Sequence, residues 1–193
     1  MDIHATAIGE VKILQPRIFD DERGFLVETW RQEEWKGSVS ALDLVQDNHS
    51  RSTRGVLRGL HFQEPKAHGK LVRVSRGEIF DVAVDVRLGS PTFGRWVGVT
   101  LSDKNQHQLW VPPGFAHGFL VLSDIADVPY RATGYYAPDC EHTVSWNDPD
   151  IGIDWPLGDL DGPVLSERDR GAVRLRDLPE ESLAVFNPAD SVG

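Results

Sequence analysis

A histidine and an arginine stand among the apolar residues of the stretch GVLRGLHFQ, residues 55–63. Leu57, Leu60 and Phe62 give this stretch an apolar side that suits a strand. His61 is a candidate general base, because its unperturbed pKa of roughly 6.5 lies near working pH. A histidine in an apolar strand is also often a hydrogen-bonded core residue, so His61 alone leaves both interpretations open.

The spacing of Arg58 and His61 sets a geometric condition. They are three residues apart, and successive side chains of a regular strand point to opposite faces. If both contact the same ligand, the strand must bulge or kink between them, and Gly59 is the residue that would permit it. Such a strand would direct both side chains into the lumen of a barrel and place its leucines in the wall.

Three more residues have side chains suited to proton transfer. Lys70 begins the next strand pattern, and its ammonium could stabilise negative charge on a carbonyl oxygen. Tyr130 lies in the pattern VPYRAT, and its phenol could serve as an acid. Each also fits a structural role: a solvated lysine, and a tyrosine in an ordinary core. Asp169 with Ser166 fits the S-x-x-D capping box of a helix N-terminus.

The histidine pattern argues against a metal site. PPGFAHGF places His117 in the pattern Pro-x-Gly-x-x-His, which resembles the second motif of the cupin superfamily. Metal-binding cupins combine this histidine with an HxH pair and a glutamate, but here Gln63 follows His61 at the second position. A catalytic metal needs three or four convergent ligands, so we expect a cupin-like fold without metal.

Short strands broken by turns must position these residues. Strand patterns occur at 11–15, 24–30, 71–76, 78–87, 95–101, 107–111, 117–123, 128–136 and 142–146. No segment before residue 160 shows helical periodicity, whereas 166–175 and 179–186 suit short helices. This order predicts an all-β sandwich or barrel with a short helical tail.

Length and composition indicate one globular domain over residues 1–193, with a core at about 8–158 and a tail at about 163–193. Charges interrupt every apolar run before 18 residues, which predicts no membrane span. The N-terminus lacks a secretion pattern and Cys140 is the single cysteine, so a cytoplasmic location is expected.

The charge distribution favours a small anionic ligand over nucleic acid. The chain carries a net charge of −10, which is untypical of a nucleic-acid-binding protein. Residues 51–76 nevertheless hold seven basic residues and one acid. This window indicates either a local cationic site for a small anion or a solvated strand face.

Eight segments in this order resemble the dTDP-4-dehydrorhamnose 3,5-epimerase family. They are DDERGFLVE, QDNHSRS, GVLRGLHFQ, KLVRVSRGEIFDVAVDVR, SPTFGRWVGVTLS, VPPGFAHGFLVLSD, YRATGYYAPDCE and LSERD, between about residues 8 and 170. The resemblance implies a cupin jelly roll (double-stranded β-helix) with short peripheral helices near the C-terminus. It also implies a homodimer, no cofactor, and epimerisation at C3 and C5 of a dTDP-4-keto-6-deoxyhexose in rhamnose-type biosynthesis.

The resemblance also implies a role for individual residues. His61 would be the base, Asp169 its orienting partner, Tyr130 the acid on the opposite face and Lys70 the group near the C4 keto oxygen. Tyr136 would stack on the thymine. Further contacts to the nucleotide sugar would come from Arg23, Glu28, Gln46, Asp47, Asn48, Arg58, His117, Glu141 and Arg168, with Arg23 acting across a dimer interface.

The residue types agree with this chemistry. Hydrogens at C3 and C5 are acidic because both carbons flank the C4 ketone and their anions are enolates. Inversion requires the proton to return on the other face, so a second group must stand across the ring from His61. Two alternatives remain open: a mono-epimerase acting at C3 or C5 only, and a cupin sugar-binding or isomerase-like protein.

Overall fold

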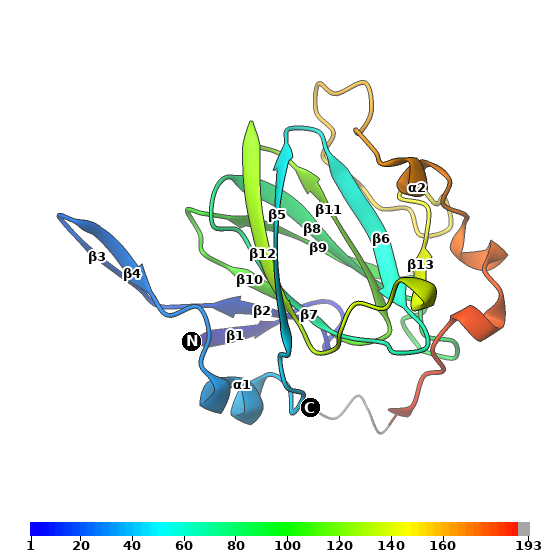
Figure 1. Ribbon diagram of the computed structural model, residues 1–193, viewed down its shortest axis with the longest axis horizontal. Helices are drawn as coiled ribbons and strands as arrows, with labels where there is room; N and C mark the ends of the chain where they lie inside the picture. Colours follow the sequence, from blue (N-terminus) through cyan, green and yellow to red (C-terminus); the bar gives the residue numbers. More distant parts are fainter. Residues whose placement is uncertain (189–193) are drawn as a thin grey trace.

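The computed structural model describes residues 1–188, and most of its strands form two facing antiparallel sheets (Figure 1). The first sheet has the order β1-β2-β10-β7-β12-β5: Asp2–Ala5, Lys12–Gln15, Gln108–Val111, Lys70–Arg73, Ile125–Ala132 and Gln46–Thr53. The second has the order β13-β6-β11-β8-β9: Glu141–Thr143, Leu57–Gln63, Phe115–Val121, Glu78–Asp85 and Trp96–Ser102. The all-β prediction is confirmed.

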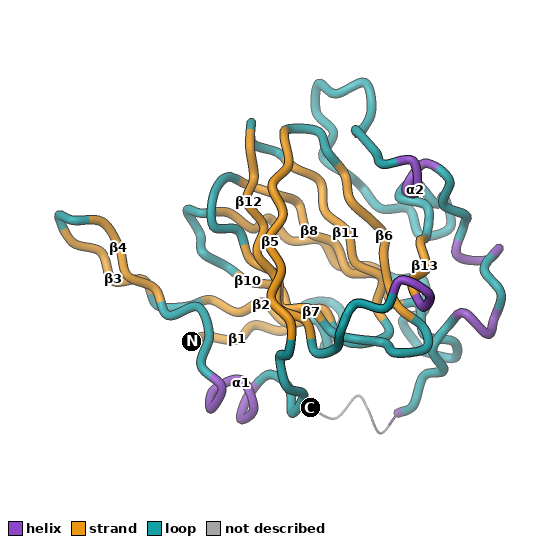
Figure 2. The backbone as a smooth tube through the Cα atoms, viewed as in Figure 1, coloured by secondary structure: helices purple, strands orange, loops and turns teal. Residues whose placement is uncertain are grey.

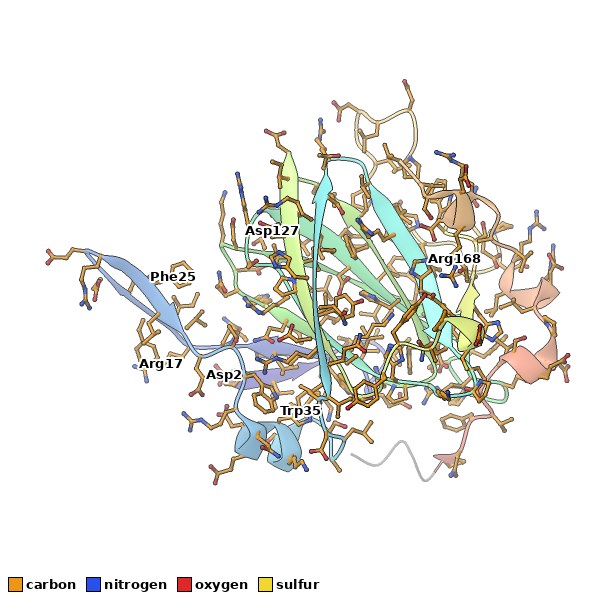
Figure 3. The ribbon with its side chains drawn as sticks, in the orientation of Figure 1. Asp2, Arg17, Phe25, Trp35, Asp127 and Arg168 are labelled. Atoms are coloured by element: carbon orange, nitrogen blue, oxygen red, sulfur yellow. The ribbon has the colours of Figure 1, made fainter. Side chains whose placement is uncertain are left out.

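A separate two-stranded hairpin, β3 (Ile18–Asp21) with β4 (Gly24–Val27), projects away from the two sheets (Figure 1). Its apolar side chains are largely exposed: Phe25 is 57% and Leu26 71% accessible. Figure 3 shows Phe25 on this arm, beyond the body of the molecule.

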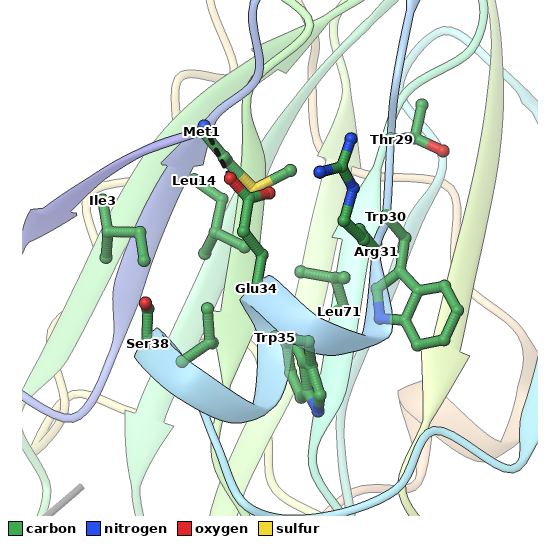
Figure 4. Close-up of a pocket in the computed structure, with 11 residues that line it drawn as sticks. Met1, Ile3, Leu14, Thr29, Trp30, Arg31, Glu34, Trp35, Ser38 and Leu71 are labelled. Carbon is green, nitrogen blue, oxygen red and sulfur yellow. Dashed lines mark hydrogen bonds and ion pairs between the residues drawn. The ribbon is translucent and has the colours of Figure 1, made fainter.

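The prediction of no helix before residue 160 is wrong, because α1 spans Gln32–Ser38 (Figure 2). This helix buries a single large residue, Trp35, so its sequence shows no apolar repeat. Trp35 packs edge-on against Trp110 of β10, with ring centroids 4.9 Å apart. Figure 4 shows Trp35 near Leu71, Leu14 near Met1, and the N-terminal amine of Met1 bonded to Glu34.

The C-terminal helices are shorter than predicted. They are single turns: α2 (Glu167–Arg170), η2 (Leu175–Asp177) and η3 (Glu180–Ser182), and a further turn, η1 (Pro138–Cys140), precedes β13. The last five residues of the expected tail, 189–193, lie outside the described part of the chain. The tail covers the outer face of the second sheet, where Leu175 and Leu183 join a core with Leu57, Leu120 and Val84.

A second core fills the space between the sheets. Val72 and Val128 of the first sheet belong to one buried cluster with Ala83 and Phe119 of the second. This core occupies one part of the barrel, and the polar residues described below occupy the rest. The apolar packing therefore holds the two sheets apart at the distance that the site needs.

A bulge in β6 turns Arg58 and His61 to the same side. Phe119 of β11 pairs with Arg58 and His117 pairs with His61, so β6 advances three residues where β11 advances two. The extra residue in β6 reverses the alternation of its side chains. Arg58 and His61 therefore both face the lumen, as do their paired residues Phe119 and His117. Gly59 lies in this bulge with φ +132°, and the predicted break in alternation is confirmed.

Replacing Gly59 with alanine should destabilise the barrel. A Cβ there would lie 2.5 Å from the Gly118 Cα and 2.9 Å from the His117 carbonyl oxygen, both backbone atoms. We expect Gly59→Ala to lower the free energy of unfolding by about 2–4 kcal/mol, measured by denaturant titration. Gly24→Ala is the matched control, because Gly24 has φ +122° but an open Cβ position, and it should cost about 1–2 kcal/mol. Equal losses would contradict the close-approach argument.

Candidate active site

A cavity of about 300 Å³ opens between the two sheets at the ends of β6, β7 and β12. It brings together seven of the predicted site residues: Gln46, Asn48, His61, Lys70, Tyr130, Tyr136 and Glu141. A second cavity lies under α1, among the residues of Figure 4, and measures only about 50 Å³. A more open hollow of about 500 Å³ lies on the exposed hairpin β3–β4. The cavity between the sheets has a volume usual for small-molecule sites, about 300–1,000 Å³, and it gathers seven predicted residues, so it is the candidate site.

His61 and Asp169 form a hydrogen-bonded pair at the wall of this cavity. The His61 Nε2 lies 2.6 Å from the Asp169 Oδ1, and the carboxylate is almost fully buried. Burial opposes ionisation of Asp169, but the hydrogen bonds with His61 and Ser166 outweigh it and lower the pKa of the carboxyl. An ionised carboxylate here orients the ring and stabilises its protonated form.

The capping box holds Asp169 in place. The Ser166 hydroxyl donates to the Asp169 Oδ2 at 2.8 Å and accepts from the Asp169 backbone N–H at 3.1 Å. The predicted cap is therefore present, and its aspartate also faces His61. Asp169 is therefore both the capping-box partner of Ser166 and the partner of His61.

Lys70 faces the cavity from the start of β7. Burial lowers the pKa of its ammonium to about 8, although the charges of Glu141 and Asp81 oppose that change. Next to it, burial and the Lys70 charge lower the pKa of His68 to about 4, so this imidazole is neutral near pH 7. Of these two neighbouring residues, Lys70 therefore supplies the positive charge in the cavity near pH 7.

Tyr130 lines the cavity from the sheet opposite to His61. It lies on β12, in register with Asn48 of β5 and Val72 of β7, whereas His61 lies on β6 of the second sheet. Burial, assisted by the Glu141 charge, raises the pKa of its phenol, which keeps the hydroxyl protonated. His61 and Tyr130 thus line the same cavity from different sheets.

Tyr136, Glu141 and Arg168 form a polar group at the mouth of the cavity. The Tyr136 hydroxyl donates to the Glu141 Oε2 at 2.6 Å, and the Arg168 guanidinium donates to the same oxygen. Burial alone would raise the pKa of Glu141, but these two donors lower it. The ring of Tyr136 stays 54% exposed, which leaves a face open for stacking.

His117 is buried behind the cavity, where sequence reasoning missed its partner. The His117 Nε2 lies 2.8 Å from the Asp81 Oδ1, and Asp81 is fully buried. Burial lowers the pKa of His117, and Asp81 opposes that change. Asp81 belongs to the strand pattern 78–87, and its inward direction depends on the register with β11.

Seven predicted residues are not among those lining the cavity of this chain: Asp169, His117 and Arg168, described above, and Arg23, Glu28, Asp47 and Arg58. Arg58 faces the lumen but bonds the Ser52 hydroxyl at 3.0 Å, and Asp47 pairs with Arg131 across β5 and β12. Arg23 pairs with Asp21 on the projecting hairpin. Glu28, just beyond the hairpin, pairs with Arg31.

The structure adds four cavity residues that the sequence did not single out: Phe62, Gln63, His68 and Ala132. His68 stands two residues before Lys70, and both face the cavity. This two-residue spacing is the feature of the sequence that could have predicted it. Gln63 was noted only as the missing second histidine of HxH. Their roles depend on loop contacts that have no local pattern.

The cationic window 51–76 divides in the fold. Arg51 bonds Asp127 in a bidentate pair and Arg54 bonds Asp159. Lys70 lines the main cavity, but Arg73 lines a separate small pocket beside Trp30. The cations of this window therefore do not gather at one place: Lys70 lines the main cavity, whereas Arg51 and Arg54 pair with carboxylates elsewhere.

The described residues contain no cluster of three or more His, Cys, Asp or Glu side chains arranged to hold a metal ion. In residues 1–188, no helix is long and apolar enough to cross a bilayer.

Comparison with known proteins decides the family. The family model described as dTDP-4-dehydrorhamnose 3,5-epimerase matches residues 5–177. This chain belongs to the dTDP-4-dehydrorhamnose 3,5-epimerase family. The predicted family and enzyme class are confirmed.

Relatives and solved structures agree with this assignment. The chain is 52% identical to the Neisseria gonorrhoeae dTDP-4-dehydrorhamnose 3,5-epimerase over 97% of its own length, and spans 60% of that relative. It is 54% identical to the Pseudomonas aeruginosa protein of the same name, covering 85% of this chain and 90% of the relative. A Legionella pneumophila dTDP-6-deoxy-D-glucose-3,5-epimerase, solved with dTDP-4-keto-L-rhamnose, superposes with a TM-score of 0.94 at 49% identity, covering 96% of this chain and 98% of that one. The cupin fold is confirmed.

The His61–Asp169 pair predicts the effect of Asp169→Asn. Asparagine presents either an amide donor or a neutral oxygen to the His61 Nε2, so it cannot stabilise the protonated ring. We expect the epimerisation rate to fall by about 10²–10⁴-fold while the melting temperature changes by only a few degrees. Rates would come from an NMR time course; a fall of less than about threefold would contradict the assigned role.

The pKa of Lys70 predicts an alkaline limit to activity. The ammonium loses its charge as the pH rises through about 8, and a neutral amine stabilises an enolate oxygen less well. We therefore expect kcat/KM to fall above about pH 8. Lys70→Met should lower the rate by about 10²–10³-fold, and the residual activity should not fall above about pH 8 in this way. An identical fall in the variant would assign it to another group.

Proposed function

We propose that this chain is a cofactor-independent epimerase that inverts C3 and C5 of a dTDP-4-keto-6-deoxyhexose in rhamnose-type deoxysugar biosynthesis. The observation that supports it is the placement of His61, paired with Asp169, and Tyr130 on opposite sheets around one cavity that also holds Lys70. Inversion next to a ketone needs a base, an acid across the ring and a cation for the enolate.

His61 removes the first proton. Its Nε2 is bonded to Asp169, so Nδ1 is the nitrogen left to accept a proton. The C3–H or C5–H bond breaks, the proton moves to His61, and the electron pair forms an enolate with the C4 oxygen. Asp169 stabilises the imidazolium, and Lys70 stabilises the enolate oxygen by its positive charge.

Tyr130 completes the inversion from the other face. Its hydroxyl donates a proton to the enolate carbon, which restores the ketone with the opposite configuration. The raised pKa of the phenol keeps this proton available before the reaction. The tyrosinate regains a proton from solvent, and His61 releases its own, so the cycle is balanced without a cofactor.

The residues at the mouth bind the nucleotide in this proposal. Tyr136 stacks on the thymine with its exposed ring, and Arg168 offers a guanidinium to the diphosphate. The remaining contacts inferred from the family motifs are Gln46, Asp47, Asn48, Arg58, His117 and Glu141. Of these, Asp47, Arg58 and His117 are not among the residues that line the cavity of this chain.

We further propose a homodimer, in which the hairpin β3–β4 reaches a partner's site. Two features support this: the hairpin projects from the body (Figure 1), and its Phe25 and Leu26 are exposed. A second copy would cover this apolar surface. Arg23 and Glu28 would then contribute to the partner's nucleotide site. A cytoplasmic location stays a prediction.

Deuterium exchange tests the function. In heavy water, the protein should exchange the C3 and C5 hydrogens of dTDP-4-keto-6-deoxyglucose for deuterium, with inversion at both carbons. NMR would monitor the exchange. His61→Asn should abolish exchange, because asparagine is not a base at neutral pH. Tyr130→Phe should slow inversion more than proton loss, because it removes only the returning proton.

Each outcome selects one reading. Absence of exchange at both carbons would overturn the epimerase function. Inversion at one carbon only would select the mono-epimerase alternative. Exchange that survives His61→Asn would remove His61 from the role of base, and equal effects of Tyr130→Phe on both steps would remove the face-specific acid.

A further inference from the structure

Gln63 occupies a special place beside the catalytic pair. It lies two residues after His61 on β6, where metal-binding cupins carry the second histidine of HxH. Its side chain lines the cavity and is only 4% exposed. A buried amide of this kind needs hydrogen-bond partners, and the partners show what the residue does.

The Gln63 amide makes three hydrogen bonds, all to backbone. Its Oε1 accepts from the Ala137 N–H at 2.9 Å, and its Nε2 donates to the Lys66 carbonyl at 3.1 Å and to the Tyr135 carbonyl at 3.4 Å. One N–H donor and two carbonyl acceptors fix which end of the amide is oxygen.

Two of these bonds enclose Tyr136. Tyr135 and Ala137 are its neighbours on either side, and the segment 133–137 between β12 and η1 has no regular secondary structure. A second side-chain amide acts on Tyr136 itself, because the Tyr136 N–H donates to the Gln46 Oε1 at 3.1 Å. Gln63 is the buried member of this pair of glutamines, so it holds the loop from inside the protein.

The remaining bond reaches the loop that leads to Lys70. Lys66 belongs to the turn between β6 and β7 and has a left-handed backbone with φ 73°. Lys66 stands four residues before Lys70, and its carbonyl oxygen accepts the hydrogen bond from Gln63. One amide thus joins the segment that carries Tyr136 to the segment that precedes Lys70.

We propose that Gln63 is a positioning residue for nucleotide recognition. It holds the backbone on both sides of Tyr136, so that the ring is presented to the pyrimidine base of the nucleoside diphosphate with little loss of entropy on binding. This rests on the proposed function, in which Tyr136 stacks on the base. Gln63 itself transfers no proton.

Two substitutions test the proposal. Gln63→Met keeps the length of the side chain and removes all three bonds. Gln63→Glu keeps the bond to the Ala137 N–H but cannot donate to the Lys66 and Tyr135 carbonyls. Both should raise the dissociation constant of dTDP, measured by calorimetry, and the KM of the sugar nucleotide by about tenfold or more. The kcat at saturating substrate should change less than about threefold.

A matched control separates positioning from loss of a buried amide. Gln106 is 7% exposed, and its Nε2 donates to the Asp103 carbonyl in a turn that contributes no residue to the cavity. Gln106→Met should lower the melting temperature without changing the affinity for dTDP. A similar loss of affinity in this control would overturn the proposal.

A double-mutant cycle with Tyr136→Ala gives the decisive readout. If Gln63 acts through Tyr136, Gln63→Met should not weaken dTDP binding further once the ring is absent. A full tenfold loss in the Tyr136→Ala background, or unchanged affinity in both Gln63 variants, would overturn the proposal. If the Met variant fails to fold, the Glu variant enters the same cycle. Failure of the proposed function is distinguishable, since it would abolish dTDP binding or deuterium exchange in the wild type.

Discussion

The hydrogen bond between His61 and Asp169 joins residues that are 108 positions apart in the chain, and the site depends on it. His61 can face the lumen only because β6 bulges at Gly59. Asp169 can meet it only because the C-terminal segment follows β6, where Val164 bridges to Val56 and pairs with Gly55. The capping serine then fixes the carboxylate. This one contact thus depends on the bulge in β6, on the pairing of the C-terminal segment with the start of β6, and on the helix cap.

The two sheets divide the chemistry between them. The second sheet supplies His61, while the first supplies Tyr130, Asn48 and Lys70. The apolar core between the sheets sets their separation, and the C-terminal tail covers the outer face of the second sheet. His61 and Tyr130 therefore come from separate sheets, which is the arrangement that the proposed proton transfer on opposite faces of one ring requires.

Much of the fold and part of the site followed from the sequence. Alternating apolar residues revealed most strands, and His61, Lys70 and Tyr130 do share one cavity. Other elements carried no usual signal. β5 has a polar sequence, QDNHSRST, because its inner face lines a polar cavity, and α1 buries only Trp35. The roles of Asp81 and Gln63 were not predicted, because their partners, His117 and the backbone of two loops, are distant or lack a side-chain pattern.

The sequence by itself determined the family, the all-β class and the kinds of groups available for enolate chemistry, because these are carried by residue identity, order and alternation. Tertiary structure decided which groups meet. It left Nδ1 of His61 free by engaging Nε2, and sent Lys70 to the cavity while Arg51 and Arg54 found carboxylates elsewhere. The physical reason is that a side chain's direction depends on strand register and bulges, and its partners on contacts between distant segments, neither of which is written in local sequence.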